Sequence, residues 1–152
     1  MNTRISLWVI VALWGLWAAC KKENKMSKIP FIKLMTTTDS VRAGNSKDTV
    51  RINFQFEDGD ADIKTDGQTV NIFVSNTRDT THFNYPFPYI DEAYKGNGTG
   101  FKGTATIKIP AAFLLLRDPF MPIDSVGFSV LIQDAAGNKS NELHTPLVYL
   151  LK

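Results

Sequence analysis

Residues 49–63 read TVRINFQFEDGDADI and combine a clear strand pattern with an acidic loop directly after it. In the first part of this stretch, polar residues alternate with four apolar ones, Val50, Ile52, Phe54 and Phe56. A period of two places alternate side chains on opposite faces of a β-strand, so residues 49–57 predict a strand with one buried face. This pattern is typical of an antiparallel sheet that covers a core with one face and meets water with the other.

Similar short apolar segments recur on both sides of this strand, separated by turns rich in glycine, asparagine and proline. The further predicted strands are 29–35, 69–76, an extended stretch 82–89, 104–109, 124–133 and 142–151. Their expected apolar rows are Val70, Ile72 and Val74; Val126, Phe128, Val130 and Ile132; and Leu147, Tyr149 and Leu151. A helical turn is possible only at 111–117. About seven short strands predict an all-β fold, an antiparallel immunoglobulin-like sandwich whose two sheets bury their apolar rows against each other.

The first twenty residues differ from this body. Arg4 precedes an apolar run at 5–17, and Ala18, Ala19 and Cys20 follow it. A positive start, a short apolar run and small residues before the cut are typical of a secretory signal peptide. The run of 13 residues is short of the roughly 20 that a spanning helix needs, although an uncleaved membrane helix and a signal peptide with a free thiol stay open as alternatives. We expect a signal peptide at 1–19, a tether at 20–28 and a sandwich domain at 29–152.

The overall charge is close to balanced. Lysine and arginine number 17, and aspartate and glutamate number 15. This balance argues against nucleic acid as a partner, because nucleic-acid binding depends on clustered positive charge. Five lysines lie just after the apolar run, at Lys21, Lys22, Lys25, Lys28 and Lys33. They indicate either a tether that contacts anionic headgroups or a solvated linker.

The acidic loop predicts a metal site. Asp58, Asp60 and Asp62 alternate with small residues, and Asp66 follows shortly after. Carboxylates this close repel one another, and a hard cation relieves the repulsion. Calcium fits best, because it takes six to eight oxygen ligands in flexible loops. The loop is not an EF-hand, since its sixth and twelfth positions are Ile63 and Thr69 instead of glycine and glutamate.

A second acidic turn, Asp134 to Asn138, lies before the last predicted strand. In an immunoglobulin-like sandwich the loop after the second strand and the loop before the last strand share one end. We therefore expect Asp134 and Asn138 to approach the first loop. The alternative is that both segments are ordinary turns. The candidate metal ligands are Asp58, Asp60, Asp62, Asp66, Asp134 and Asn138.

Three short segments carry a resemblance to a known group of proteins. Residues 56–63 resemble the F-x-D-G-D-G-D-[IL] segment of small Bacteroidota lipoproteins, with Ala61 where glycine is usual. Residues 134–141 resemble the D-x-x-G-N-x-S-N close of bacterial immunoglobulin-like domains. Cys20 resembles the lipobox cysteine, which implies that its thiol is diacylated and becomes the mature N-terminus. The resemblance implies a lipid-anchored protein of the cell envelope. The outer membrane is favoured, because Lys21 does not resemble the aspartate that signals inner-membrane retention in some bacteria.

The aromatic segment 82–89, HFNYPFPY, is a second candidate surface. Tyr85, Phe87 and Tyr89 could stack on a sugar ring or contact a partner protein. The alternative is that Phe83 and Phe87 belong to the core.

Catalytic motifs are absent from the sequence. It contains no nucleophile elbow, phosphate loop or dinucleotide fingerprint, and neither His82 nor His144 has a neighbouring cysteine or histidine for zinc. We therefore expect a protein that is not an enzyme: a cell-envelope lipoprotein acting as a calcium-stabilised binding or scaffolding module, with an envelope protein or glycan as partner. A glycan-binding accessory that uses the aromatic segment is the first alternative, and a small hydrolase is the second.

Overall fold

The computed structural model describes residues 26–79, 81–91 and 100–152. The expected signal peptide, Cys20 and most of the expected tether therefore lie outside the described residues. The strands within these ranges are β1 (Phe31–Thr37), β2 (Ser40–Arg42), β3 (Thr49–Asp58), β4 (Val70–Asn76), β5 (His82–Pro86), β6 (Phe101–Pro110), β7 (Ile123–Val126), β8 (Phe128–Ile132), β9 (Leu143–His144) and β10 (Val148–Leu151). A short 3-10 helix, η3 (Ala111–Phe113), follows β6. Within the described residues, no helix has the length and hydropathy needed to cross a bilayer.

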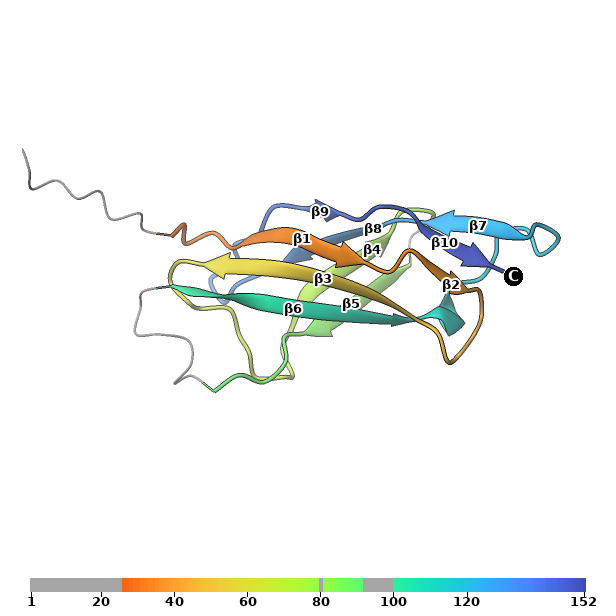
Figure 1. Ribbon diagram of the computed structural model, residues 1–152. Coiled ribbons are helices and arrows are strands. Elements are labelled where there is room, and N and C mark those ends of the chain that lie inside the picture. The colour runs from red at the N-terminus through yellow and green to blue at the C-terminus, as the bar shows by residue number, and fades with distance from the viewer. Residues whose placement is uncertain (1–25, 80, 92–99) are drawn as a thin grey trace, which may run out of the picture.

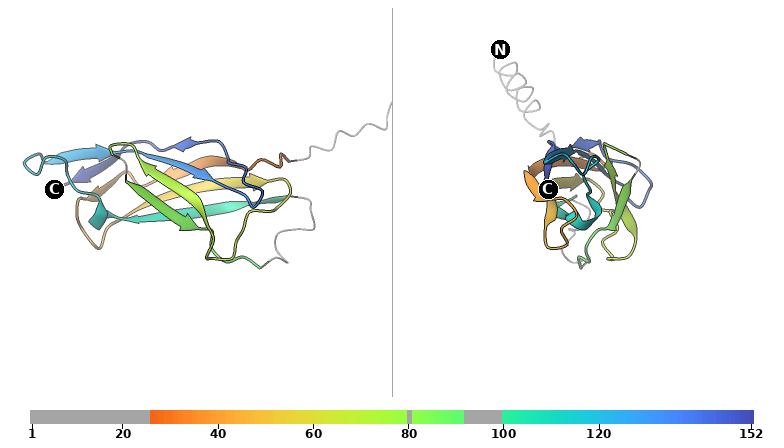
Figure 2. Two further views of the ribbon diagram at one scale, coloured as in Figure 1. Left: turned by 180° about the vertical axis from the view of Figure 1, so that it is seen from behind. Right: turned by 90° about the vertical axis from the view of Figure 1, so that its right-hand side faces the viewer.

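The strands form two facing layers. One sheet has the order β1-β3-β6 and another the order β5-β4-β8-β9, all with antiparallel neighbours. A third sheet, β2-β10-β7, lies at the end where the chain finishes (Figure 1). Viewed from behind, β4, β5 and β8 lie in front of the β1-β3-β6 layer (Figure 2). The N-terminal part of the chain changes partner between Thr37 and Ser40, because β1 pairs with β3 whereas β2 pairs in parallel with β10.

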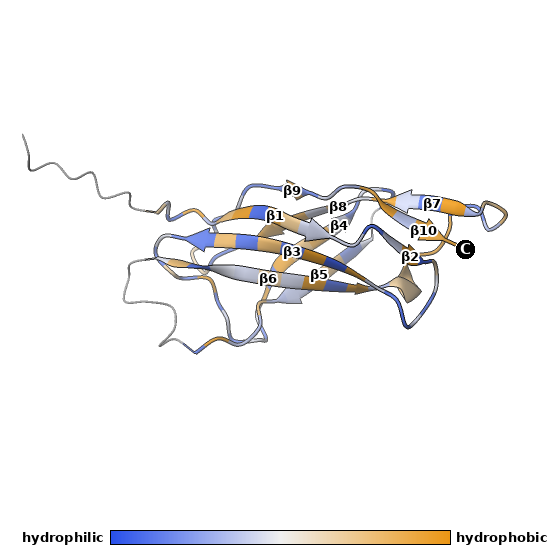
Figure 3. Ribbon diagram, in the orientation of Figure 1, coloured by the Kyte–Doolittle hydropathy of each residue, from blue (hydrophilic) through white to orange (hydrophobic). Residues whose placement is uncertain are grey.

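The buried rows of both layers meet in one core. On β3 the row Val50, Ile52, Phe54 and Phe56 is at most 2% exposed, as the alternation predicts. Figure 3 shows this alternation as bands of opposite hydropathy along the strand. Val126, Phe128, Val130 and Ile132 are likewise fully buried. The prediction of an all-β antiparallel sandwich is confirmed, and its immunoglobulin-like identity stays a prediction.

One predicted apolar row is wrong at its first residue, and another faces solvent. On β4, Ile72 and Val74 are buried as the alternation predicts. On β4 the side chain of Val70 is 48% exposed and Asn71 is buried in its place. A register shift between Val70 and Ile72 in the β4–β5 pairing explains the change. At the C-terminus, Leu147, Tyr149 and Leu151 do share a face, but they lie on the exposed side, whereas Val148 and Leu150 are buried.

The predicted strand 124–133 is also divided. Gly127 separates β7 from β8, and its backbone amide and carbonyl both bond to Thr77. A Cβ at Gly127 would lie 2.9 Å from the hydroxyl oxygen of Thr77, so a side chain has no room there. The last predicted strand, 142–151, is likewise two strands, β9 and β10, and the short β2 has no counterpart among the predicted strands.

Candidate metal centre

The two acidic segments lie at the same end of the sandwich. Both β3 and β8 point toward that end in Figure 1. Asp58 is the last residue of β3, and Asp134 follows β8 by two residues. Because these strands belong to facing layers, their exit loops meet across the end of the core. The expected approach of the two loops is confirmed.

Three carboxylates converge there. One oxygen each from Asp58, Asp62 and Asp134 lies within 4.8 Å of the others. Asp58 is 0% exposed and Asp134 is 7% exposed, so two of the three groups are removed from water. The arrangement could hold a metal ion.

In Asp58 and in Asp62, one carboxylate oxygen accepts a hydrogen bond and the other accepts none. The amide of Ile63 donates to Asp58 Oδ2 over 3.1 Å, and the amide of Ala136 donates to Asp62 Oδ2 over 3.1 Å. The Oδ1 atoms of Asp58, Asp60 and Asp62 are buried and accept no hydrogen bond. A buried oxygen without a partner loses its hydration with no compensation, and a bound cation would restore it.

The electrostatics of the cluster agree with this geometry. Burial, reinforced by the charges of Asp62 and Asp60, raises the pKa of Asp58 to about 6 despite the hydrogen bond from Ile63. Burial also raises the pKa of Asp62, and the charges of Asp134 and Asp60 add to the increase. Without a cation, Asp58 therefore stays largely protonated below a pH of about 6.

A pH dependence of stability follows. In the metal-free protein, Asp58 keeps its proton up to a pKa of about 6, whereas an unfolded aspartate loses it near pH 4. The folded state then binds more protons between about pH 4 and 6, so its free energy of unfolding should fall as pH rises through that window. Thermal melts from pH 4 to 7 in a chelator measure this trend. A metal-free protein that becomes steadily more stable up to pH 7 would contradict it.

Hydrogen bonds to neighbouring groups hold the carboxylate of Asp134 in place. The amide of Asn138 donates to Asp134 Oδ1 over 2.7 Å, and its side-chain amide donates to Asp134 Oδ2 over 2.8 Å. The amide of Ala135 also donates to the backbone oxygen of Asp62 over 3.3 Å. Asn138 thus lies beside the cluster, as expected, and orients Asp134 through its amide groups.

Ala61 adopts a left-handed backbone, with φ at 60°. This conformation costs a residue with a side chain roughly 1–2 kcal/mol. The turn at Ala61 places Asp60 and Asp62 on either side of a tight bend.

Asp66 lies outside the converging group. Its carboxylate accepts hydrogen bonds from the amides of Gln68 and Thr69 and from the hydroxyl of Thr69. The bond from the Thr69 hydroxyl, followed by the two amides, lowers the pKa of Asp66 to about 2. Asp66 closes its own turn, so the structure gives it a local role and does not place it with Asp58, Asp62 and Asp134.

Asp60 lies next to the cluster and also meets the N-terminal segment. The ammonium of Lys28 is 4.0 Å from Asp60 Oδ2. The amide of Gly59 donates to the backbone oxygen of Ser27 over 2.7 Å, and a Cβ on Gly59 would lie 2.3 Å from the backbone oxygen of Met26. Because the backbone of Met26 and Ser27 passes this close to the loop, only glycine fits at position 59.

Two asparagines that sequence reasoning missed support the site. Asn71 donates to the backbone oxygen of Lys64 over 2.6 Å and accepts from the amide of Phe87 over 2.9 Å. Asn141 bonds to both backbone groups of Ile32 and so ties the end of the second turn to β1. Asn141 could have been found from sequence, because it is the last residue of the D-x-x-G-N-x-S-N segment at 134–141. Asn71 could not, because the strand alternation predicts that its side chain points outward.

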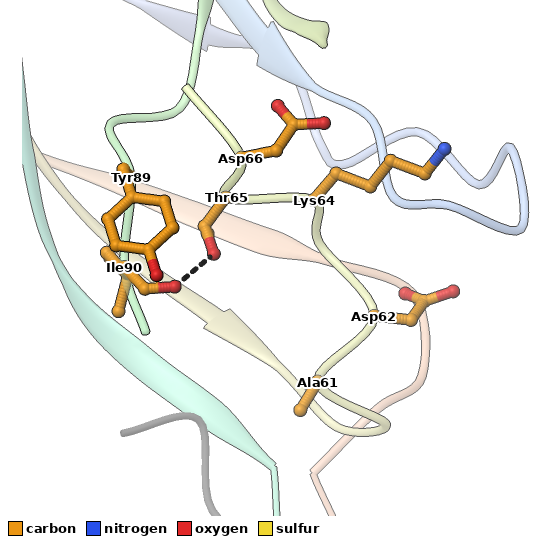
Figure 4. Close-up of a pocket in the computed structure, with 7 residues that line it drawn as sticks. All are labelled: Ala61, Asp62, Lys64, Thr65, Asp66, Tyr89 and Ile90. Carbon is orange, nitrogen blue, oxygen red and sulfur yellow. Dashed lines mark hydrogen bonds between the residues drawn. The ribbon is translucent and has the colours of Figure 1, made fainter. Parts of the chain in front are cut away.

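A shallow pocket of about 410 Å³ lies beside the acidic loop. Its lining residues are Ala61, Asp62, Lys64, Thr65, Asp66, Tyr89 and Ile90 (Figure 4). The hydroxyl of Thr65 donates to the backbone oxygen of Ile90 over 3.1 Å, which joins the acidic loop to the end of the aromatic segment. In Figure 4 the side chains of Asp62 and Asp66 lie apart along the loop.

The aromatic segment does not present the expected three rings together. Phe87 is 1% exposed, and its ring packs edge-on against Phe56 with centroids 5.1 Å apart. Tyr85 is half-buried, and its hydroxyl donates to the backbone oxygen of Lys108 over 3.1 Å. Of the three, Tyr89 alone is well exposed, at 73%. Phe87 therefore belongs to the core and is not a stacking surface.

No protein-family model, no curated protein and no solved structure matches this chain.

Proposed function

We propose that this protein is a non-catalytic module of the cell envelope that binds calcium between its two acidic loops and is anchored to the membrane through Cys20. One observation carries the metal part. Asp58 Oδ1 is buried and unpartnered beside Asp62 and Asp134. A charged group that is removed from water without a partner is costly, and a cation resolves that cost.

The donor chemistry favours calcium over other ions. The three converging groups are all carboxylates. Zinc sites are built mainly from cysteine and histidine, whereas calcium takes oxygen ligands at about 2.3–2.6 Å in flexible loops. Three oxygens within 4.8 Å of one another have a common point at most about 2.8 Å from each, so a small side-chain adjustment brings all three to calcium distance. The free Oδ1 of Asp60 is available as a further ligand.

The bound ion would link the two layers of the sandwich at this end. It would join residues 58–62, at the end of one layer, to Asp134, at the end of the other. These segments are already linked, because the amide of Ala135 donates to the backbone oxygen of Asp62 and the amide of Ala136 donates to its carboxylate. A rigid end on a lipid-anchored sandwich suits adhesion or scaffolding with another envelope component.

Calorimetric titration of the purified protein at pH 7 tests the metal site. We expect one calcium ion per chain, and loss of at least about tenfold in affinity for Asp58→Asn, since a ligand charge is removed. Asp66→Asn is the matched control, because it removes the same charge from the same loop outside the cluster. Equal weakening by both variants would refute the assigned ligand set.

Mass spectrometry of the native protein tests the anchor. We expect a chain that begins at Cys20 and carries acyl groups on that residue. Two or more acyl chains bind a bilayer far more firmly than one chain, whose attachment is marginal. An unmodified thiol, or a chain that still begins at Met1, would remove the membrane part of the proposal and leave the metal part intact.

A further inference from the structure

The outer face of the β1-β3-β6 sheet carries an excess of positive charge. The alternation that buries one row of β3 and β6 turns the other row outward. The outward residues of these two strands are Arg51, Asn53, Gln55 and Glu57 on β3, and Lys102, Thr104, Thr106 and Lys108 on β6. On β1, Phe31, Lys33, Met35 and Thr36 are also exposed. Four cations therefore share this face with one carboxylate, that of Glu57.

None of these cations forms an ion pair within 4.0 Å among the described residues, although Lys102 lies directly opposite Glu57 in the β3–β6 pairing. The ion pairs found there join Lys28 to Asp60, Arg42 to Asp48, and both Arg78 and Arg117 to Asp124. None of them includes a cation of this face. Arg51 lies directly opposite Lys108 in the β3–β6 pairing. Like charges in directly opposed positions destabilise a sheet, and a bound anion would relieve that repulsion.

Uncharged hydrogen-bonding groups lie between the charges. The side-chain amide of Asn53 donates to the hydroxyl of Thr36 over 2.7 Å, and the hydroxyl of Thr106 donates to the side-chain oxygen of Asn53 over 2.6 Å. These bonds fix a polar row across all three strands. In the next row Gln55 lies opposite Thr104, and both are exposed.

The spacing describes a long, flat site. The four outward pairs, from Arg51 and Lys108 to Glu57 and Lys102, follow in register along the strands. At about 6.8 Å for every second residue, they cover about 20 Å, and three strands cover about 10 Å of width. This shape suits an extended polymer with repeated charges better than a single small anion.

We propose that this face binds an acidic polysaccharide that lies along the strands, with its acidic groups on the cations and its hydroxyls on the intervening amides and threonines. The proposal goes beyond the calcium-binding function and does not depend on it. It also places glycan recognition on a sheet face instead of the aromatic segment. A polysaccharide is favoured over a lipid surface because amide and hydroxyl groups separate the charges on β3 and β6, whereas the exposed apolar side chains, Phe31 and Met35, lie on the edge strand β1.

Binding of hyaluronan to the full chain in neutral detergent micelles tests the proposal. We expect the double variant R51Q/K108Q to weaken binding about tenfold, as two lost charge contacts allow. The control K64Q/K139Q removes the same charge from exposed positions outside this face and should change affinity less than about twofold. Thermal melts check that all variants fold. Equal weakening by the two double variants would overturn the assignment to this face.

Further comparisons test whether the face recognises a saccharide, any polyanion or an anionic lipid. Q55A/T104A keeps the charge and should weaken hyaluronan binding about threefold while leaving polyacrylate binding unchanged, because polyacrylate has no hydroxyls. Neutral dextran should not bind. Equal loss for both polymers would reduce the site to a nonspecific anion surface and overturn the proposal. Displacement of hyaluronan by phosphatidylglycerol added to the micelles would assign the face to the membrane. The titrations are run with and without calcium, so polysaccharide binding can be judged even if the protein does not bind calcium.

Discussion

Calcium at about one hundred times its dissociation constant is expected to raise the melting temperature of the metal-free protein at pH 7 by about 10 °C. An ion that binds the folded state alone at this excess adds about 2.7 kcal/mol to the free energy of unfolding. For a domain of this size each 1 kcal/mol shifts the midpoint by about 4 °C. The effect is large because the ion removes two penalties together, the repulsion among Asp58, Asp62 and Asp134 and the desolvation of the unpartnered Oδ1 atoms of Asp58 and Asp62.

The variant Asp58→Asn separates the metal from other causes of stabilisation. It keeps the shape of the side chain and removes a buried charge, so the metal-free protein at pH 7 should be at least as stable as the parent, while the calcium shift should disappear. Asp66→Asn should retain the shift, because that carboxylate bonds only within its own turn. Differential scanning calorimetry measures all three proteins. A full calcium shift in Asp58→Asn would rule out the cluster as the site.

The calcium shift should also depend on pH in a defined direction. Because the pKa of Asp58 is raised to about 6 without metal, calcium must displace a proton below that pH. The shift in melting temperature should therefore grow between pH 5 and pH 7. A shift of the same size at both pH values would show that the ion binds elsewhere.

Asp124→Ala is expected to destabilise the fold by about 3–5 kcal/mol, the usual loss when one partner of a buried ion pair is removed. Asp124 Oδ2 accepts from Arg78 Nη1 over 2.8 Å, and the two side chains are 9% and 8% exposed. Arg117 bonds to the same carboxylate over 2.6 Å and is the main reason why the pKa of Asp124 lies well below its usual range. Without Asp124, the buried guanidinium of Arg78 keeps only the backbone oxygen of Leu115 among these partners.

Arg117→Gln is the matched control for that prediction. The side chain of Arg117 is 67% exposed, so its ion pair is largely screened, and we expect a loss of about 1 kcal/mol or less. Urea denaturation measures both variants. A loss below about 1 kcal/mol for Asp124→Ala would show that Arg78 reaches water or another acceptor when its partner is removed.

The longer strands were predictable from sequence where the two faces differ in polarity, whereas the three residues of β2 are too few to show an alternation. On β3, Arg51, Asn53 and Gln55 separate the apolar residues, so the alternation specifies both the strand and its buried row. From Leu147 to the end of β10 at Leu151, every residue is apolar or aromatic. A uniformly apolar run does not indicate which alternate residues are buried. Only the packing shows that Val148 and Leu150 face the core while Tyr149 faces out.

Two other differences arose from single side chains with long-range partners. Asn71 is buried because it bonds to Lys64 and Phe87, which come from different segments of the chain. Gly127 divides the predicted strand 124–133 because Thr77 occupies the space beside it. Phe87 is 16 residues from Asn71, and Thr77 is 50 residues from Gly127, so local alternation carries no signal for these contacts.

The sequence by itself determined the all-β class and the presence of two acidic turns, because both depend on neighbouring residues alone. Only the tertiary structure decided which carboxylates meet. Asp58, Asp62 and Asp134 converge because β3 and β8 end together in facing layers, whereas Asp66 is held by the amides of its own turn. Spacing along the chain cannot separate these cases, since the choice between a local hydrogen bond and a distant carboxylate is made by the packing of the two sheets.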